Sequence, residues 1–239
     1  MASVALFDPC YMSVLRPRDA ANAQRVLQAL GDDVTLLDGR CCGQPAFNSG
    51  YRAEARTVGR ELLRSAQPFS SIVLPSGSCS AMVQHYLPML FDGTRRTGAQ
   101  AIAARFHEFN SYVATHPRFD RLGLKLEGVV AYHDSCHGRR ELGITDTVTG
   151  LLARVEGLEV RRLPHEEECC GFGGTFSVKM REVSVAMMTA KLEEVSATGA
   201  RVLVSADFSC LAHLEAGARG MGLELEVWTM PELLARALA

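Results

Sequence analysis

The chain has 239 residues, an apolar fraction of 47% and a formal net charge of −2 at neutral pH. This length allows one large domain or two smaller ones, each able to bury a core. The small net charge gives no electrostatic basis for binding nucleic acid or an anionic membrane. No apolar run approaches the ~20 residues that span a bilayer, and the first residues lack the basic segment of a signal peptide. We therefore expect a cytoplasmic protein without a transmembrane segment and without a nucleic-acid partner.

The predicted elements follow one pattern twice along the chain. Strands are expected over 4–7, 34–37, 71–75, an apolar run from Val129, 158–163 and 201–205. Helices are expected before Gly31 and over 51–66 and 181–198, and the chain should close with a strand over 223–228 and a helix over 231–239. Each half then runs strand, helix, strand, helix, strand. This order predicts an α/β fold of two tandem, similar parallel-sheet halves, with domains at 1–120 and 121–239.

The eight cysteines form two sets of the same shape. The first set is Cys10, Cys41, Cys42 and Cys79, and the second is Cys136, Cys169, Cys170 and Cys210. Matching cysteines are 126, 128, 128 and 131 residues apart, so small loop insertions superimpose the two sets. All eight are expected in loops that follow strands, at the edge where parallel α/β sheets bind ligands. In a reducing compartment such cysteines serve as ligands or redox groups more often than as disulfides.

Directly adjacent cysteines favour a polynuclear metal centre. A single zinc ion usually takes its thiolates from a pair separated by two residues. Neighbouring side chains in extended backbone point to opposite sides, which suits a cluster with several irons better. Four thiolates are also the usual complement of a [4Fe–4S] cluster. We therefore predict one or two iron–sulfur clusters per chain, with zinc as the alternative and strained vicinal disulfides as a weaker third option.

Glycines follow the adjacent cysteines and are predicted to help bind a cofactor. Gly43 and Gly171 would let the backbone approach a cluster closely. Gly171, Gly173 and Gly174 would aim backbone N–H groups at its sulfides and so tune its potential.

Histidines and acids border the first cysteine of each set. His133 and His137 flank Cys136 and are candidates for carrying a proton coupled to electron transfer, because imidazole titrates near neutral pH. The alternative for each is a histidine hydrogen-bonded at a strand end. Asp8 and Asp134 precede the first cysteines and are expected to accept backbone N–H bonds that shape the ligand loops.

The doubled arrangement Cys…Cys-Cys-Gly…Cys resembles a known family, the cysteine-rich CCG domain pair. This pair occurs in the cysteine-rich subunit of heterodisulfide reductase, the glycolate oxidase iron–sulfur subunit and lactate utilisation protein A. The segments 132–137 and 169–177 look most like the lactate utilisation member. The resemblance covers almost the whole chain.

The resemblance implies an iron–sulfur electron-transfer subunit of a complex that oxidises L-lactate or a related 2-hydroxy acid. The partners would be the other subunits of that complex, one of which should carry ferredoxin-type clusters. One alternative is a catalytic heterodisulfide or thiol–disulfide reductase, and another is a zinc-stabilised structural subunit.

One departure limits what the resemblance carries over. In the heterodisulfide reductase member of the family the last cysteine of each set belongs to a pair separated by two residues, so each set has five cysteines. Here the partner positions hold Ser76 and Asp207. The five-thiolate clusters of that enzyme therefore do not transfer. Ser76 and Asp207 are either weak oxygen ligands or simply a turn serine and a strand-end aspartate.

Overall fold

The computed structural model describes residues 3–37 and 41–238. The ends of the two predicted domains, Met1, Ala2 and Ala239, lie outside the described residues. The strands are β1 (Ser3–Phe7), β2 (Asp33–Leu37), β3 (Ile72–Leu74), β4 (Phe106–Glu108), β5 (Lys125–His133), β6 (Glu156–Arg162), β7 (Val202–Ser205) and β8 (Glu226–Thr229). The α-helices are α1 (Cys10–Leu15), α2 (Arg18–Ala29), α3 (Gln44–Asn48), α4 (Arg52–Ala66), α5 (Gly77–Ala81), α6 (Gly93–Ala103), α7 (Phe109–Thr115), α8 (Thr145–Leu152), α9 (Thr175–Lys179), α10 (Arg181–Ala197), α11 (Phe208–Gly220) and α12 (Met230–Ala237). Short helical segments are η1 (Met82–Tyr86), η2 (Leu87–Leu90), η3 (Phe119–Arg121) and η4 (Gly138–Leu142).

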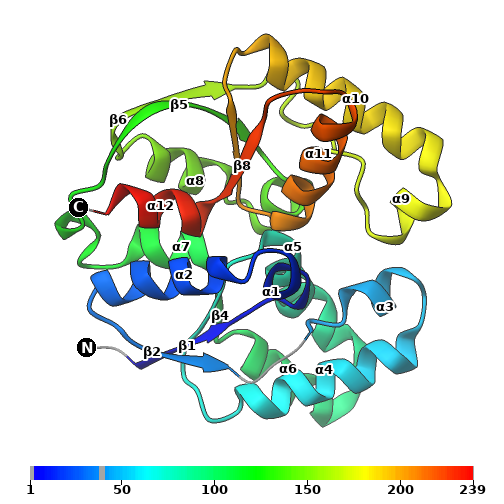
Figure 1. Ribbon diagram of the computed structural model, residues 1–239. Helices are drawn as coiled ribbons and strands as arrows, with labels where there is room; N and C mark the ends of the chain where they lie inside the picture. Colours follow the sequence, from blue (N-terminus) through cyan, green and yellow to red (C-terminus); the bar gives the residue numbers. More distant parts are fainter. Residues whose placement is uncertain (1–2, 38–40, 239) are drawn as a thin grey trace.

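The strands form two parallel four-stranded sheets with matching topology (Figure 1). The first sheet has the order β2-β1-β3-β4 and the second the order β6-β5-β7-β8, with every neighbouring pair parallel. The register is also matched, since Val4 faces Val34 in one sheet and Val130 faces Val160 in the other. The predicted α/β fold with two similar parallel-sheet halves is therefore confirmed.

The prediction of three strands in the first half was incomplete, whereas the closing strand predicted for the second half is present as β8. β4 adds a fourth strand to the first sheet, and the closing strand β8 takes the matching place in the second. β4 is only three residues long, and its middle residue, His107, is exposed. Three residues are too few for the alternation of apolar and polar side chains that indicates a strand.

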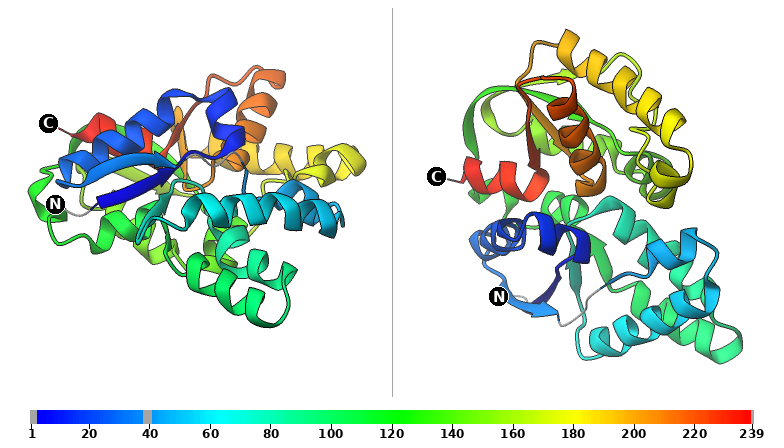
Figure 2. Two further views of the ribbon diagram at one scale, coloured as in Figure 1. Left: turned by 90° about the horizontal axis from the view of Figure 1, so that it is seen from below. Right: turned by 45° about the vertical axis from the view of Figure 1, so that its right-hand side comes forward.

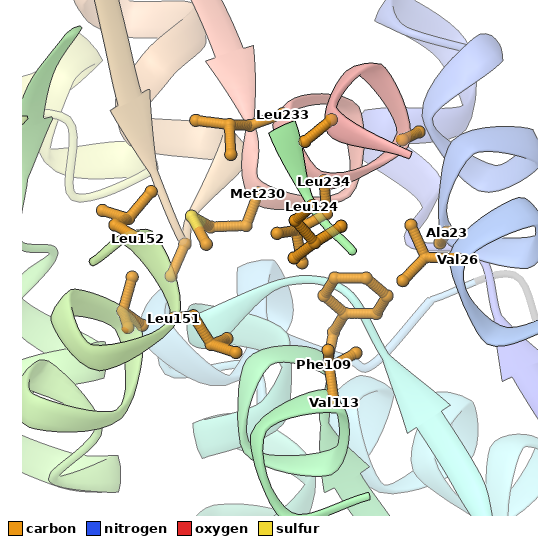
Figure 3. Packing of buried hydrophobic residues seen from close by; sticks show 14 of the residues in the cluster. Ala23, Val26, Phe109, Val113, Leu124, Leu151, Leu152, Met230, Leu233 and Leu234 are labelled. Carbon is orange, nitrogen blue, oxygen red and sulfur yellow. The ribbon is translucent and has the colours of Figure 1, made fainter. Parts of the chain in front are cut away.

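The two halves share one hydrophobic core between their sheets. Alternate side chains of β1 divide between two clusters: Val4 and Leu6 enter a central cluster, while Ala5 and Phe7 enter an outer one. The central cluster also contains apolar side chains from α2 and α7 of the first half and from α8 and α12 of the second (Figure 3). In both views of Figure 2 the terminal helix α12 lies against α2, and these helices make direct contacts.

Further helices cover the outer face of each sheet. The cluster on the first sheet includes Leu62 and Leu63 of α4, and the cluster on the second includes Leu192 of α10 and Leu211 of α11. The layers are thus outer helices, sheet, shared inner helices, sheet and outer helices. This stacking places the carboxyl ends of both sheets' strands around one space.

Candidate metal centres

Both cysteine sets line a single cavity of about 420 Å³ between the two halves. Its walls come from the segments that follow β1, β2 and β3 in the first half and β5, β6 and β7 in the second. All eight predicted cysteines contribute to the lining: Cys10, Cys41, Cys42, Cys79, Cys136, Cys169, Cys170 and Cys210. All eight are free thiols.

Four of the cysteines lie in helices rather than in the loops that the sequence predicted. Cys10 begins α1, Cys79 lies in α5, Cys136 begins the helical turn that continues into η4, and Cys210 lies in α11. Helices as short as α1 and α5 contain too few residues for an apolar period to show.

The four sulfurs of each set form a continuous string in the same order. In the first half Cys10 interacts with Cys41, Cys41 with Cys42, and Cys42 with Cys79. The last contact has 3.4 Å between the two Sγ atoms. The string in the second half is Cys136, Cys169, Cys170 and Cys210. The repeat seen in the sequence is thus a repeat in space.

The electrostatics of each string suit a bound cation. Hydrogen bonds from Cys10 and Cys42 lower the pKa of Cys41 to about 2, and the pKa of the donor Cys10 rises in return. Cys136 and Cys170 act in the same way on Cys169, lowering its pKa to about 2. Adjacent thiolates repel each other, so a full set can ionise only when a metal supplies positive charge. The donor type, number and spacing therefore fit a metal or iron–sulfur centre in each half.

The two glycines after the cysteine pairs adopt conformations in which an L-residue would be strained, and their approach to a cluster remains a prediction. Gly43 and Gly171 adopt φ angles of +85° and +90°, which favour glycine. A Cβ on Gly171 would lie 2.5 Å from the carbonyl oxygen of Ser184 in α10, so the close approach is to a helix. The N–H groups of Gly43 and Gly171 donate to the Sγ atoms of Cys41 and Cys169, at 3.4 and 3.3 Å.

The other predicted glycines lie at the cavity wall. Gly173 and Gly174 both line the cavity and have positive φ angles of +51° and +61°. They form the bend that leads from the second cysteine pair into α9. Their N–H contacts to a cluster remain a prediction.

The two histidines around Cys136 occupy contrasting places. His137 lines the cavity, and its Nε2 lies 3.4 Å from the amide nitrogen of Gln44 in the first half. His133 is buried behind the second cysteine set, where burial lowers its pKa to about 4. The predicted role of both residues in proton transfer remains a prediction, and only His137 is among the residues that line the cavity.

Ser76 and Asp207 cap helices instead of pointing free oxygens at the sulfurs. The Oγ of Ser76 accepts a hydrogen bond from the N–H of Cys79 at the start of α5. Asp207 is completely buried, and both of its carboxylate oxygens accept hydrogen bonds, from Ser78 and from Ser209. These hydrogen bonds favour the alternative in which Ser76 is a turn serine and Asp207 a strand-end aspartate over the one in which they ligate a metal.

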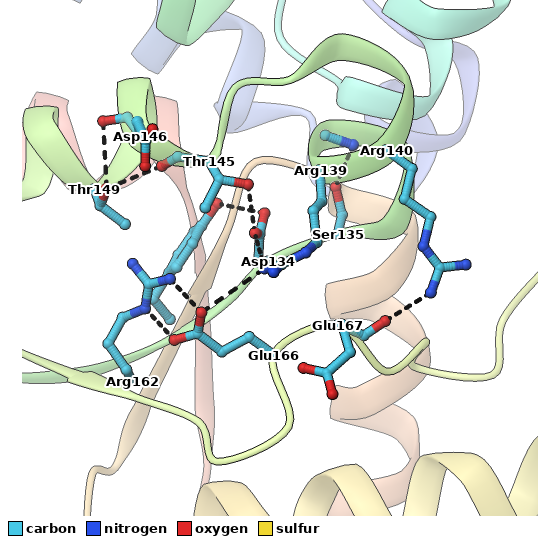
Figure 4. Close-up of polar contacts among 12 residues, drawn as sticks. Asp134, Ser135, Arg139, Arg140, Thr145, Asp146, Thr149, Arg162, Glu166 and Glu167 are labelled. Carbon is cyan, nitrogen blue, oxygen red and sulfur yellow. Dashed lines mark hydrogen bonds and ion pairs between the residues drawn. The ribbon is translucent and has the colours of Figure 1, made fainter.

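Asp134 organises the loop of the second set through side chains, not through the backbone N–H bonds that we expected. Its carboxylate accepts from the Tyr132 hydroxyl, from Arg139 at 3.2 Å and from Thr145 at 2.6 Å (Figure 4). Asp8, its counterpart, has no hydrogen-bond partner for Oδ1 among the described residues.

Several cavity residues were not singled out from the sequence. Tyr11 packs on Phe172 and Phe208, with ring centroids 5.9 and 5.5 Å apart, and together they line the cavity with aromatic surface from both halves. Gln44 donates to the carbonyl of Ser78 at 3.2 Å. Tyr11 directly follows Cys10, so a search of the residues next to each cysteine would have found it.

Comparison with known proteins agrees with the doubled site. The sequence profile of the cysteine-rich domain, CCG, matches residues 4–84 and again residues 130–215. The chain belongs to the cysteine-rich domain family. Both copies contain the cysteine pair and the first and last cysteines of a set.

Full-length relatives match this chain from end to end. The chain is 34% identical to lactate utilization protein A 2 of Bacillus cereus (strain Q1), over 99% of both chains. It is 35% identical to lactate utilization protein A of Geobacillus sp. (strain WCH70), over 97% of this chain and 98% of that protein. A crystal structure of a hypothetical protein from Helicobacter pylori matches 99% of this chain and 50% of that chain, with a TM-score of 0.62. At 9% identity this likeness shows the fold alone.

Within residues 3–37 and 41–238, none of the helices combines the length and the apolar character needed to cross a membrane.

Proposed function

We propose that this cysteine-rich domain protein is an iron–sulfur electron-transfer subunit of a cytoplasmic complex that oxidises L-lactate or a related 2-hydroxy acid. The observation that carries the proposal is the pair of matching sulfur strings that open into one cavity. When bound, iron–sulfur clusters take up and release single electrons. Their shared cavity brings the two centres into one continuous site, as a relay requires.

The substrate and the partners are inferred from the relatives. Proteins with 34–35% identity over nearly their full length are named for lactate utilisation. The chain's site offers thiols and one histidine, His137, which suit electron and proton transfer more than hydride transfer. We therefore propose that other subunits oxidise the substrate, that one of them carries ferredoxin-type clusters, and that His137 moves protons at the cavity wall.

Anaerobic purification tests the cofactor directly. Wild-type protein should contain iron and acid-labile sulfide, and reduction should produce an electron paramagnetic resonance signal. Cys42→Ser and Cys170→Ser are matched by the repeat, and each should remove the iron of its own half while leaving the other half loaded. Stoichiometric zinc without labile sulfide would show the zinc-stabilised alternative instead.

Growth tests the substrate separately. A strain that lacks the gene should grow poorly on L-lactate and normally on glucose, and only the wild-type gene should restore growth. L-lactate should reduce the bound clusters only when the partner subunits are present. If the purified protein contains clusters but the strain that lacks the gene grows normally on L-lactate, the proposed cofactor stands and the proposed substrate is wrong.

A second candidate function is reduction of a small disulfide in the cavity itself. The specific observation in its favour is the apolar, aromatic cavity between the two cysteine sets, large enough for a small ligand. This function predicts disulfide reduction by the isolated protein with an artificial electron donor. Electron relay predicts no turnover without the partner subunits.

A further inference from the structure

The side chain of His133 is buried, and its ring nitrogens form no hydrogen bond within the described residues. It ends β5, it is only 1% exposed, and neither Nδ1 nor Nε2 has a hydrogen-bond partner there. Leaving a buried polar atom unpaired costs roughly 1–3 kcal/mol. An apolar side chain at this position would avoid the cost of burying unpaired nitrogens. A histidine here is therefore explained only if its ring binds a partner.

The ring faces the second cysteine set. A nitrogen of His133 and the Sγ atoms of Cys170 and Cys210 all lie within 4.8 Å of one another, and all three residues are buried. Metal–nitrogen and metal–sulfur bonds are about 2.0 and 2.3 Å long, so three donors at this spacing can reach one metal atom.

The neighbouring polar groups are already engaged with other partners. Lys191 donates to the carbonyl of His165 and to Glu194. The carboxylate of Asp207 accepts from Ser78 and Ser209. The sulfur atoms of the second cysteine set are therefore the neighbouring groups with which the imidazole of His133 can share a metal.

The first half has no counterpart to this residue. The offset of 126 residues that superimposes Cys10 on Cys136 places Phe7 at the position of His133. Phe7 ends β1 and is fully buried in an apolar cluster. The repeat is thus broken at one buried position beside the sulfurs, where one half has a hydrocarbon ring and the other has a ring that can ligate a metal.

We propose that His133 is a nitrogen ligand of the metal centre in the second half, which makes that centre a cysteine–histidine site while the first is all-cysteine. The inference rests on the proposed function only in the identity of the metal. A neutral imidazole raises the potential of a centre where it takes the place of a thiolate. The two centres would then differ in potential if His133 displaces one of the four cysteines of the second set.

Pulsed electron paramagnetic resonance tests the ligation. Protein labelled with [15N]histidine, with Cys42→Ser to leave the first set unloaded, should show the strong nitrogen coupling of a bound imidazole when reduced. His133→Phe, which copies the residue of the first half, should abolish the coupling, and His137→Gln should retain it. Iron and sulfide without nitrogen coupling, or coupling that persists in His133→Phe, would overturn the proposal while leaving the proposed function intact.

Thermal melting supplies a measurement that does not depend on which metal binds. In metal-free protein His133→Phe should raise the melting temperature, because it removes the unsatisfied polar atoms. In metal-loaded protein the same change should reduce the gain in melting temperature that the metal confers. A lower melting temperature without metal, together with an unchanged gain on loading, would identify a purely structural histidine and overturn the ligation. Absence of iron and sulfide from every preparation would instead reject the proposed function.

Discussion

The carboxylate of Asp207, in the second half, accepts a hydrogen bond from the backbone N–H of Ser78, in the first. Beside it the N–H of Gly77 donates to the carbonyl of Ala206 at 3.1 Å. The starts of α5 and α11 are therefore joined directly, and these are the helices that carry Cys79 and Cys210. One buried carboxylate thus fixes the last cysteine of one set relative to that of the other.

Asp207→Asn should destabilise the protein and loosen both cysteine sets. The amide would turn an N–H group toward one of the donors that the carboxylate now accepts, at a completely buried position. We expect a loss of about 2–3 kcal/mol in the free energy of unfolding, measured with urea on metal-free protein. Ser76→Ala removes the corresponding cap of α5 and should cost only about 1 kcal/mol. Equal losses from the two variants would contradict a bridging role for Asp207.

Gly171→Ala should disturb the second set more than its backbone angle alone explains. A methyl group there would meet the Ser184 carbonyl at 2.5 Å, so α10 must move. Gly143→Ala is the matched control, because Gly143 has φ +64° and no atom within 4 Å of the added carbon. The control should cost about 1–2 kcal/mol, the usual penalty of the left-handed conformation. Gly171→Ala should cost more and lower the iron content of the second half, measured with Cys42→Ser in the background.

The elements that the sequence revealed are those with long, uninterrupted patterns. The run Val4-Ala5-Leu6-Phe7 is buried on both faces and is therefore continuously apolar, as parallel strands are. The helix before Gly31 was evident because Ala23, Val26 and Leu27 recur on one face and a glycine follows them. In the structure Gly31 adopts φ +84°, a conformation that favours glycine. The repeat offsets likewise identified the two cysteine sets, since they need only residue identity.

Other parts of the site depend on long-range packing and left no local pattern. The cavity shared by both sets lies between halves that pack on each other through contacts such as those of α12 with α2, helices about 200 residues apart in the chain. Cys10 and Cys79 lie in helices of six and five residues, too short for periodicity. The isolation of His133 is a property of its surroundings, and a histidine next to an Asp-Ser-Cys segment gives no sign of it.

Glu108→Gln should make the protein less sensitive to rising pH. Burial raises the pKa of Glu108 above its ordinary value, so the folded state holds this proton more tightly than the unfolded state. Its contribution to stability is complete below the ordinary pKa and is lost as the pH rises through the folded-state pKa. The variant should therefore be more stable than wild type at pH 7–8 and converge with it near pH 4. The Glu108 carboxylate accepts from the Nδ2 of Asn110 at 2.6 Å and from the N–H of Ser111 at 2.9 Å. The variant keeps both contacts if its oxygen faces Ser111 and Asn110 flips, so that the Oδ1 of Asn110, unpartnered among the described residues, accepts from the new amide.

Urea unfolding of metal-free protein across this pH range measures the effect of Glu108→Gln. Metal must be absent because cluster binding itself depends on pH. Glu193→Gln, at an exposed position on α10, controls for the change in net charge. A wild-type curve that runs parallel to that of Glu108→Gln at every pH would show that Glu108 does not titrate as its burial implies.

Phe109→Ala should weaken both halves at once. Phe109 on α7 is fully buried in the central cluster, with Val26 of α2 and Leu234 of α12 in the same cluster (Figure 3). Such truncations cost about 3–5 kcal/mol. Trp228, the single tryptophan, packs on this cluster from β8 of the second half, so its fluorescence reports how the second half unfolds.

Because both halves share the central cluster, we expect one unfolding midpoint for Phe109→Ala, lower than that of wild type, whether unfolding is followed by Trp228 fluorescence or by far-ultraviolet circular dichroism. Met82→Ala, in the outer cluster of the first half, is the companion variant. It should also lower the Trp228 midpoint, because a shared core makes the halves unfold together. Domains that fold independently at 1–120 and 121–239 would instead leave Trp228 at its wild-type midpoint in Met82→Ala. The shared core favours the first result, since α2, α7, α8 and α12 would each lose their apolar partners if one half unfolded alone.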